Sequence, residues 1–345
     1  MTFGSFRLNT LGVSAAVAKL TSLAMPSSTF PNLIIFNRSG DTFTKLSDPS
    51  SLPASIGTQK QVRFNATGSS LAITDSNSPY LYVYNRSGDT FTKIANPGTL
   101  PPAECHGVDW NPAGTSIAVA HDSSPYVTIY NRSGNTLTKI SNPSTLPGGS
   151  GEGIGWNHDG TSLAVGYGGA SPGFIVYNRS GDTFTSIGTY TPGGGVYAVA
   201  WNPTGTSLAV AHGSSPYISI YNRSGNTLTK VSNPGTLPPG GGWGVDWNPA
   251  GTSLAVAHDG SPYVTIYNRS GDTFTKIANP GTLPTGSGQS VSWNYDGTSL
   301  AVLHNNSPYV TIYNRSGDTF TKLADPTGIP SSSSSGRGID FGLKP

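Results

Sequence analysis

The sequence predicts an all-β fold, a seven-bladed β-propeller with four antiparallel strands in each blade, from three observations. The tetrapeptide Asn-Arg-Ser-Gly occurs seven times, at intervals of 44–48 residues. Each repeat contains four short strand-like runs separated by Gly, Pro, Asn or Asp. The chain also ends in a single strand-like run that its first repeat lacks. Four strands in a period of about 46 residues are typical of one propeller blade.

The sixth copy of the repeat shows the four runs clearly. A first strand is expected at 244–247 and a second at 252–258, with the turn "NPAG" between them. A third strand follows at 263–268, and the turn "RSGD" leads to a fourth at 273–277. A Pro- and Gly-rich segment then connects to the next copy. Within these units we find no helical periodicity of useful length.

The two ends of the chain predict how the ring closes. The first repeat supplies three strands, at 21–25, 32–37 and 41–46, and the last adds one strand at 338–341. This last strand is expected to complete the first blade, so that the N- and C-terminal strands pair in one sheet. An open stack of repeats would need capping units, and the sequence shows none. Residues 21–345 therefore form the predicted propeller.

Residues 1–20 precede the first repeat and are predicted to form an N-terminal arm. The Ala-Val-Ala at 16–18 resembles a signal-peptide cleavage site, but Asn9, Thr10 and Gly12 interrupt the apolar centre that a signal needs. We therefore favour a segment that docks the propeller onto a larger particle. A cleaved signal peptide is the alternative.

The composition excludes several classes of function. The chain has 19 basic and 17 acidic residues, which gives no general attraction to nucleic acid or to an anionic membrane surface. The single Cys105 excludes an internal disulfide framework and a cysteine-built metal site. No apolar run is long enough to span a membrane. We expect no nucleic-acid partner, no membrane span and no cofactor.

The repeat resembles the WD-repeat propeller unit, which runs from an aromatic-Ser-Pro-Asp-Gly turn to a Val-x-Ile-Trp-Asp strand. The corresponding residues of the sixth copy are "WNPAGTSLAVAH" and "YVTIYN". The similarity covers nearly the whole chain from 21 to 345 and implies the propeller fold. Tyr-Asn replaces the Trp-Asp pair in six copies and Phe-Asn replaces it in the first, and the usual Gly-His pair is absent.

One aromatic residue recurs in the innermost strand of every repeat. The set comprises Phe64, Trp110, Trp156, Trp201, Trp247, Trp293 and Phe341. With the Val or Ile two residues earlier, this residue forms the apolar side of its strand. We therefore expect the aromatic residues to pack between blades.

Four histidines share the last position of the second strand. They are His121, His212, His258 and His304. A metal ion needs nitrogen ligands at about 2.1 Å, but equivalent positions on different blades diverge from the axis. We expect these histidines to be structural and predict no metal site. Because the sequence also lacks a nucleophile elbow, a phosphate loop and paired catalytic carboxylates, it predicts no catalytic residues and no enzyme.

One position differs in every repeat and is the predicted ligand-binding site. It lies two residues before the Val or Ile of the innermost strand, where the interblade loop arrives. Its occupants, which we call the rim residues, are Lys60, His106, Glu152, Tyr197, Trp243, Gln289 and Arg337. The Asn-Arg-Ser-Gly turns do not vary in this way. Varied side chains on a rigid scaffold are typical of recognition surfaces.

These observations together predict a non-enzymatic recognition or structural module that binds a protein or glycan partner on the loop-rich face. The preferred setting is an adhesin or a virion-surface component, such as a phage tail or decoration protein. That setting would place the protein on a virion or a cell surface, and a cytoplasmic location is the alternative. An intracellular protein–protein interaction scaffold and a multivalent lectin are the alternative functions. A lectin would repeat its binding residues in every blade, so the rim residues favour one composite site.

Overall fold

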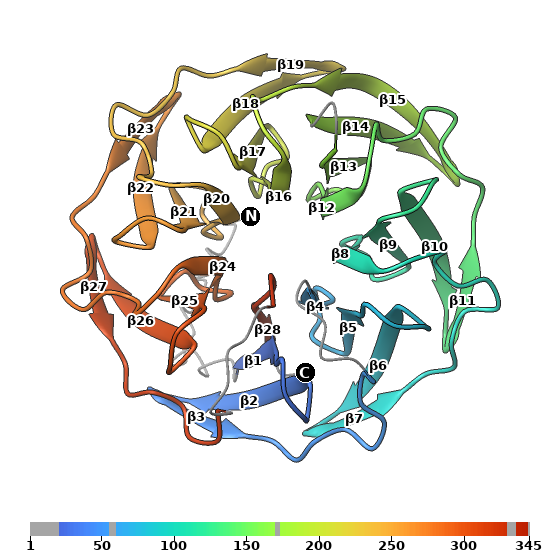
Figure 1. Cartoon of the computed structure of the whole chain (residues 1–345), viewed down its shortest axis with the longest axis horizontal. Helices are drawn as coiled ribbons and strands as arrows, with labels where there is room; N and C mark the ends of the chain where they lie inside the picture. Colours follow the sequence, from blue (N-terminus) through green and yellow to red (C-terminus); the bar gives the residue numbers. More distant parts are fainter. Residues whose placement is uncertain (1–20, 55–59, 170–172, 330–335, 344–345) are drawn as a thin grey trace, which may run out of the picture.

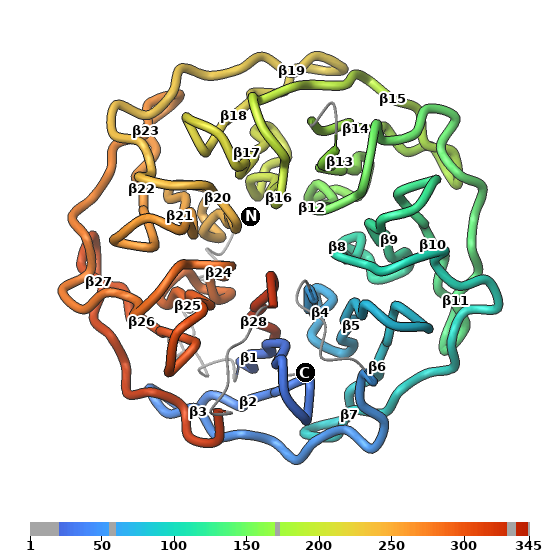
Figure 2. The backbone as a smooth tube through the Cα atoms, viewed as in Figure 1, coloured from blue at the N-terminus to red at the C-terminus, as the bar shows by residue number. Residues whose placement is uncertain are grey.

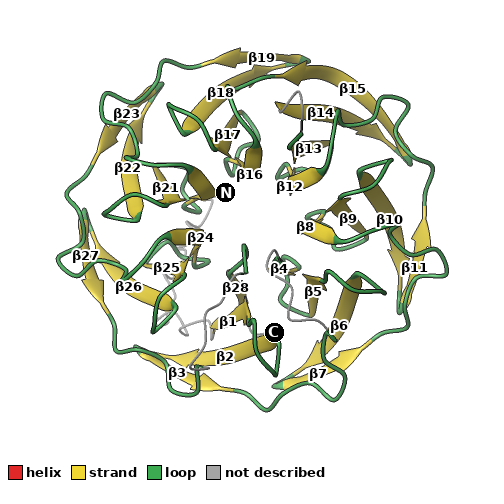
Figure 3. Cartoon of the chain, in the orientation of Figure 1, coloured by secondary structure: helices red, strands yellow, loops and turns green. Residues whose placement is uncertain are grey.

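The structure is a computed structural model that describes residues 21–54, 60–169, 173–329 and 336–343. Within these ranges the chain forms 28 strands in seven four-stranded antiparallel sheets (Figure 3). The sheets stand side by side in a ring around a central axis (Figure 1 and Figure 2). The predicted seven-bladed β-propeller is confirmed. The predicted arm at 1–20 lies outside the described residues, and the described part of the chain holds no helix suited to crossing a membrane.

The two inner strands of each blade lie nearest the axis. The innermost strands, from the first blade to the seventh, are β28 (Asp340–Leu343), β4 (Val62–Phe64), β8 (Cys105–Trp110), β12 (Gly151–Trp156), β16 (Val196–Trp201), β20 (Gly242–Trp247) and β24 (Gly288–Trp293). The second strands are β1 (Thr21–Pro26), β5 (Ser70–Thr74), β9 (Ser116–His121), β13 (Ser162–Tyr167), β17 (Ser207–His212), β21 (Ser253–His258) and β25 (Ser299–His304).

The two outer strands complete each blade. The third strands are β2 (Leu33–Ser39), β6 (Leu81–Ser87), β10 (Val127–Ser133), β14 (Gly173–Ser180), β18 (Ile218–Ser224), β22 (Val264–Ser270) and β26 (Val310–Ser316). The outermost strands are β3 (Thr42–Lys45), β7 (Thr90–Lys93), β11 (Thr136–Lys139), β15 (Thr183–Tyr190), β19 (Thr227–Lys230), β23 (Thr273–Lys276) and β27 (Thr319–Lys322). The strands expected for the sixth repeat agree with β20–β23 to within two residues at each boundary.

The first and last described strands meet in the first blade. β28 pairs antiparallel with β1, and Phe341 lies opposite Leu23. In Figure 1 the red β28 accordingly lies beside the blue β1 on the axis side. The predicted closure is therefore confirmed, although the last strand runs from Asp340 to Leu343 and not over 338–341.

Apolar residues fill the space between neighbouring blades, as expected for the recurring aromatic residue. Trp247 is 5% exposed and packs edge-on against Phe274, with ring centroids 5.8 Å apart. The same cluster includes Ala209 and Ile220 of the preceding blade. Of the seven recurring aromatics, six are buried and Phe341 is partly exposed. They therefore act as the core of the blade junctions.

Glycine in the first half of the innermost strands permits very close approach of neighbouring blades. A Cβ atom added at Gly153 would lie 2.8 Å from the Ala198 Cα, and one added at Gly244 would lie 2.7 Å from the Ser290 Cα. Real side chains do not tolerate such contacts with backbone. The innermost strands are therefore in backbone contact here, and the ring is narrow at this end of its axis.

The Asn-Arg-Ser-Gly hairpins join each blade to both of its neighbours. The Asn Nδ2 donates a hydrogen bond to an Asp or Asn Oδ1 on the next blade, at 2.6–2.8 Å in all seven junctions. The Arg donates to the Ser near the start of the second strand of the preceding blade, at 2.6–2.9 Å in all seven. We call this pair of contacts the interblade clasp. It is present between the last and first blades too, from Asn314 to Asp41 and from Arg38 to Ser299.

Deletion of residues 338–345 tests the closure of the ring. The truncated chain lacks β28, so β1 becomes an unpaired edge of the first blade. We expect a lower thermal midpoint than the full chain and association in size-exclusion chromatography. A truncated protein that stays monomeric and melts at the midpoint of the full chain would contradict the shared blade.

Replacing Arg269 by Met tests the interblade clasp. The change removes the 2.8 Å hydrogen bond to Ser207 and the guanidinium that lies 5.2 Å from the Trp247 ring. We expect the free energy of unfolding to fall by about 1–3 kcal/mol, measured by denaturant titration. Lys230→Met removes a positive charge from an exposed position and serves as the control, with an expected change within about 0.5 kcal/mol. Equal effects of the two substitutions would refute a stabilising role for the clasp.

Candidate active site

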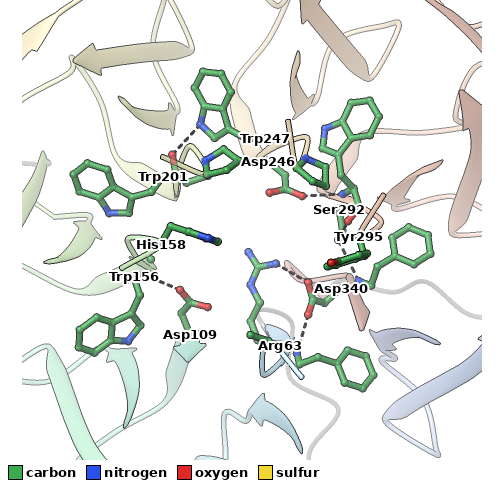
Figure 4. Close-up of a pocket in the computed structure, with 18 of the residues that line it drawn as sticks. Arg63, Asp109, Trp156, His158, Trp201, Asp246, Trp247, Ser292, Tyr295 and Asp340 are labelled. Carbon is green, nitrogen blue, oxygen red and sulfur yellow. Dashed lines mark hydrogen bonds and ion pairs between the residues drawn. The ribbon is translucent and has the colours of Figure 1, made fainter. Parts of the chain in front are cut away.

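A cavity of about 660 Å³ opens on the ring axis, at the end where the innermost strands finish. Its lining comes from all seven blades and from the turns that follow their innermost strands (Figure 4). Four charged side chains lie on the strands that line it. These floor residues are Arg63 on β4, Asp109 on β8, Asp246 on β20 and Asp340 on β28.

Strand alternation explains why these side chains face the axis. In each innermost strand the aromatic residue and the Val or Ile two positions before it pack between blades, so the residue between them points the other way. The seven residues at this position are Arg63, Asp109, Gly155, Ala200, Asp246, Ser292 and Asp340. The position is not part of the recurring aromatic packing between blades, so it can hold charged groups.

Each floor aspartate accepts a hydrogen bond from the backbone of the next blade. An innermost strand has no strand partner on its axis side, so some of its N–H groups need other acceptors. The bonds run from the amides of Trp156, Trp293 and Phe64 to Oδ2 of Asp109, Asp246 and Asp340, at 2.7, 2.8 and 2.7 Å. One oxygen of each carboxylate is therefore structural. For Asp109 and Asp246 the other oxygen lies toward the cavity (Figure 4).

Arg63 is the cation of the floor. Its Nη1 lies 3.0 Å from Oδ1 of Asp340. Burial alone would lower the pKa of Arg63, but the carboxylates of Asp340, Asp109 and Asp246 outweigh burial and hold that pKa above its ordinary value. The guanidinium therefore remains charged at every pH at which the protein is folded.

Two of the carboxylates titrate near neutral pH. Burial raises the pKa of Asp109 to about 6 and that of Asp246 to about 7, although Arg63 acts in the opposite direction on both. Near pH 7 Asp109 is mostly ionised and Asp246 is about half protonated. A buried carboxyl group that titrates near neutral pH can serve as a general base when ionised or as a general acid when protonated.

Two side chains at the mouth of the cavity depart from the repeat. The recurring aromatic is followed by Asn-Pro after Trp110, Trp201 and Trp247, but the Pro is replaced by His158 in the fourth blade and by Tyr295 in the seventh. The second and first blades carry the aliphatic residues Ala66 and Leu343 there. Both side chains are exposed, Tyr295 to 55%, and both line the cavity (Figure 4). Sequence reasoning missed them, and the replacement of proline by a polar ring side chain in a repeated turn is the signal that would have found them.

The rim residues lie three positions before the floor position, toward the other end of the axis. The structure brings four of them together. Arg337 Nη1 lies 2.7 Å from Oε2 of Glu152, and its Cζ lies 5.0 and 4.8 Å from the ring centroids of Tyr197 and Trp243. The two rings stack at 4.3 Å. These four side chains therefore contact one another, although the buried Trp243 Nε1 has no hydrogen-bond partner.

The other three rim residues are held by different neighbours. His106 Nε2 lies 2.9 Å from Oδ1 of Asp122, and Gln289 Nε2 donates to a backbone carbonyl two residues earlier at 3.4 Å. Lys60 is 1% exposed, and its carbonyl accepts a hydrogen bond from the Arg337 amide at 3.0 Å. The rim is thus largely an internally bonded cluster.

The four repeated histidines are buried structural groups. Each is fully buried, and its Nε2 lies 2.9–3.0 Å from a Thr or Ser hydroxyl on the third strand of its own blade. Burial lowers the pKa of each of them to about 4, so they are neutral near pH 7. Across the described residues no three His, Cys, Asp or Glu side chains gather closely enough to hold a metal ion.

Comparisons with known proteins place the chain among β-propellers. No protein-family model matches it, and no curated protein matches it. A candidate 6-phosphogluconolactonase of Bacteroides fragilis is 14% identical with a TM-score of 0.75, covering 95% of this chain and 99% of that chain. The periplasmic gluconolactonase of Pseudomonas aeruginosa is 14% identical with a TM-score of 0.72, covering 94% and 100%. A WD-repeat propeller, Swd1 of Myceliophteria thermophila, is more distant at 10% identity and a TM-score of 0.60, covering 85% and 96%.

The names of the neighbours contradict the predicted function. Two full-length structural neighbours are named as lactone-hydrolysing enzymes, which contradicts the prediction of a non-enzymatic recognition module and the prediction that the chain is not an enzyme. The adhesin, virion and scaffold assignments conflict with the same neighbours. The physical reason is that neither the propeller repeat nor the rim position indicates which side chains face the axis at the floor, where four charged residues line the cavity. Identities of this size show the fold alone.

Trp243 and Trp247 differ in their expected effect on stability. Trp243→Ala removes the stack on Tyr197 and the contact with Arg337, so we expect it to cost about 1–3 kcal/mol. Trp247→Ala leaves a cavity between blades and should cost about 3–5 kcal/mol. Denaturant titrations of the two variants give both values. Wild-type stability of Trp243→Ala would show that the rim cluster contributes nothing to the fold.

Proposed function

We propose that the protein is a hydrolase that opens a small lactone ring in the cavity on the ring axis. The observation that carries the proposal is the floor itself, where two carboxylates with pKa values of about 6 and 7 lie with one guanidinium. A cavity of about 660 Å³ suits a small molecule. The names of the two lactonase-type neighbours favour a lactone as the substrate.

In the proposed reaction Asp109 is the general base. Its carboxylate takes a proton from a water molecule as the water oxygen attacks the lactone carbonyl carbon. The carbonyl electrons move onto the carbonyl oxygen, which becomes an oxyanion in a tetrahedral intermediate. Because Asp109 is mostly ionised near pH 7, this step needs no prior deprotonation.

Arg63 and Asp246 complete the reaction. The guanidinium of Arg63 stabilises the oxyanion, which is the charge that develops in the transition state. Collapse of the intermediate then re-forms the carbonyl and breaks the ring C–O bond. Protonated Asp246 gives its proton to the departing alkoxide. Asp109 then releases the proton that it took from water, and Asp246 takes up a proton from solvent, so both groups return to their starting states. One lactone and one water thus yield one hydroxy acid.

The rim residues have a supporting role in this proposal. Arg337, Glu152, Tyr197 and Trp243 bond to one another where the innermost strands are in closest contact. We assign them to closing the axis opposite the cavity, so that substrate enters past His158 and Tyr295.

The test is the hydrolysis of glucono-δ-lactone, followed by proton release against the uncatalysed rate. We expect kcat/KM to rise as Asp109 ionises above a pH of about 6 and to fall as Asp246 loses its proton above about 7. Asp109→Asn and Asp246→Asn should each lower kcat/KM by about 100-fold or more. Asp246→Asn should also abolish the alkaline fall.

Asp122→Asn is the matched control, since Asp122 pairs with His106 at the rim and does not line the cavity. It should hydrolyse the lactone like the wild type. A wild-type protein that does not exceed the uncatalysed rate would overturn the proposed function, and so would Asp109→Asn and Asp246→Asn variants with full activity.

A further inference from the structure

We infer that the cavity selects uncharged, hydroxyl-bearing lactones and excludes their phosphorylated counterparts. This inference rests on the proposed hydrolase function and specifies the substrate class of the same site. The two lactonase-type neighbours are named for different substrates, one for a phosphorylated lactone and one for an unphosphorylated lactone, and the inference chooses between these two substrate classes.

The charge of the lining is the first argument. The Asp, Glu, Lys and Arg residues among the described lining of the cavity are Arg63, Asp109, Asp246 and Asp340. Three carboxylates and one guanidinium give a negative floor whenever the carboxylates are ionised. A phosphate placed against this floor meets net repulsion at short range, where solvent screens charges poorly.

The second argument is that the floor's cation and its axis-side amides already hold carboxylates. Arg63 is engaged by Asp340 at 3.0 Å. Backbone N–H groups are the other usual phosphate ligands. The axis-side amides of Trp156, Trp293 and Phe64 already donate to the floor aspartates. A phosphate would have to share Arg63 with Asp340 and displace a carboxylate from each of these amides.

The cations that precede β4 and β28, Lys60 and Arg337, lie too far along the axis. Lys60 and Arg337 are three residues before Arg63 and Asp340, a distance of about 10 Å at the usual rise of a strand. Arg337 is paired with Glu152 at 2.7 Å, and Lys60 is 1% exposed. Neither is placed to neutralise a phosphate in the cavity.

An uncharged polyhydroxy lactone suits the same lining. Carboxylate oxygens of Asp109 and Asp246 that lie toward the cavity accept hydrogen bonds from hydroxyl groups (Figure 4). The exposed ring of Tyr295 offers an apolar face at the mouth. Hydroxyl donors and ring C–H groups are the features that a sugar-derived lactone presents without any charge.

The experiment compares kcat/KM for glucono-δ-lactone and for its 6-phosphate ester in the full-length protein. We expect the wild type to favour the uncharged lactone by at least 10-fold at low salt. Raising the salt concentration from 0.05 to 0.5 M should reduce this ratio, because salt screens the repulsion of the phosphate. Asp340→Asn removes one negative charge and releases Arg63, so it should shift the ratio at least 3-fold toward the phosphate ester. Asp122→Asn, at the other end of the axis, should leave the ratio unchanged.

The outcomes separate this inference from the function on which it rests. Hydrolysis of neither lactone overturns the proposed function. Faster hydrolysis of the phosphate ester supports a lactonase and overturns the inference alone. A ratio that is insensitive to salt and to Asp340→Asn overturns the charge-based explanation, and the salt series gives this answer even if the variant does not fold.

Discussion

The interblade clasp is the interaction on which the rest of the structure depends. Each hairpin holds the following blade through its Asn and the preceding blade through its Arg, and the pattern continues across the junction between Asn314 and Asp41. Because every hairpin must serve two neighbours, substitution in one copy would damage two junctions. This explains why Asn-Arg-Ser-Gly is identical in seven copies while other positions differ. The clasp also fixes the angle between blades, which sets the positions of the innermost strands.

In each innermost strand, the residues that repeat in every blade and the residues that vary between blades lie on different faces. In an innermost strand the interblade side must be apolar, and it carries the recurring aromatic residue in every blade. The axis side has no such requirement, so it holds an Arg in one blade, an Asp in three and small residues in the rest. The rigid repeated ring therefore supports an irregular group of charges. Partial burial of those charges is what moves the pKa values of Asp109 and Asp246 toward neutrality.

The fold was readable from the sequence because its determinants are local and repeated. Period, turns and strand alternation located the blades, and the unmatched strand near residue 340 located the closure. The same alternation, applied to the residue before Trp110 or Trp247, would have placed Asp109 and Asp246 on the axis. Their proximity to Arg63 could not be predicted from the sequence, because the four floor residues come from blades far apart in the chain. Motif searches look for catalytic groups at short spacing and therefore did not find this group of four residues. The mutual packing of Arg337, Tyr197 and Trp243 across the axis was hidden for the same reason.

The ion pair between Arg63 and Asp340 joins residues 277 positions apart. Asp340 belongs to β28, the strand that closes the ring, and it also holds the backbone of Phe64 in the second blade. Ring closure and assembly of the proposed active site are therefore one event. A nascent chain on the ribosome would have neither a closed first blade nor a complete floor until β28 emerges and docks on β1. Any copy that stops before β28 would lack both the seam and the Asp340 side of the proposed active site.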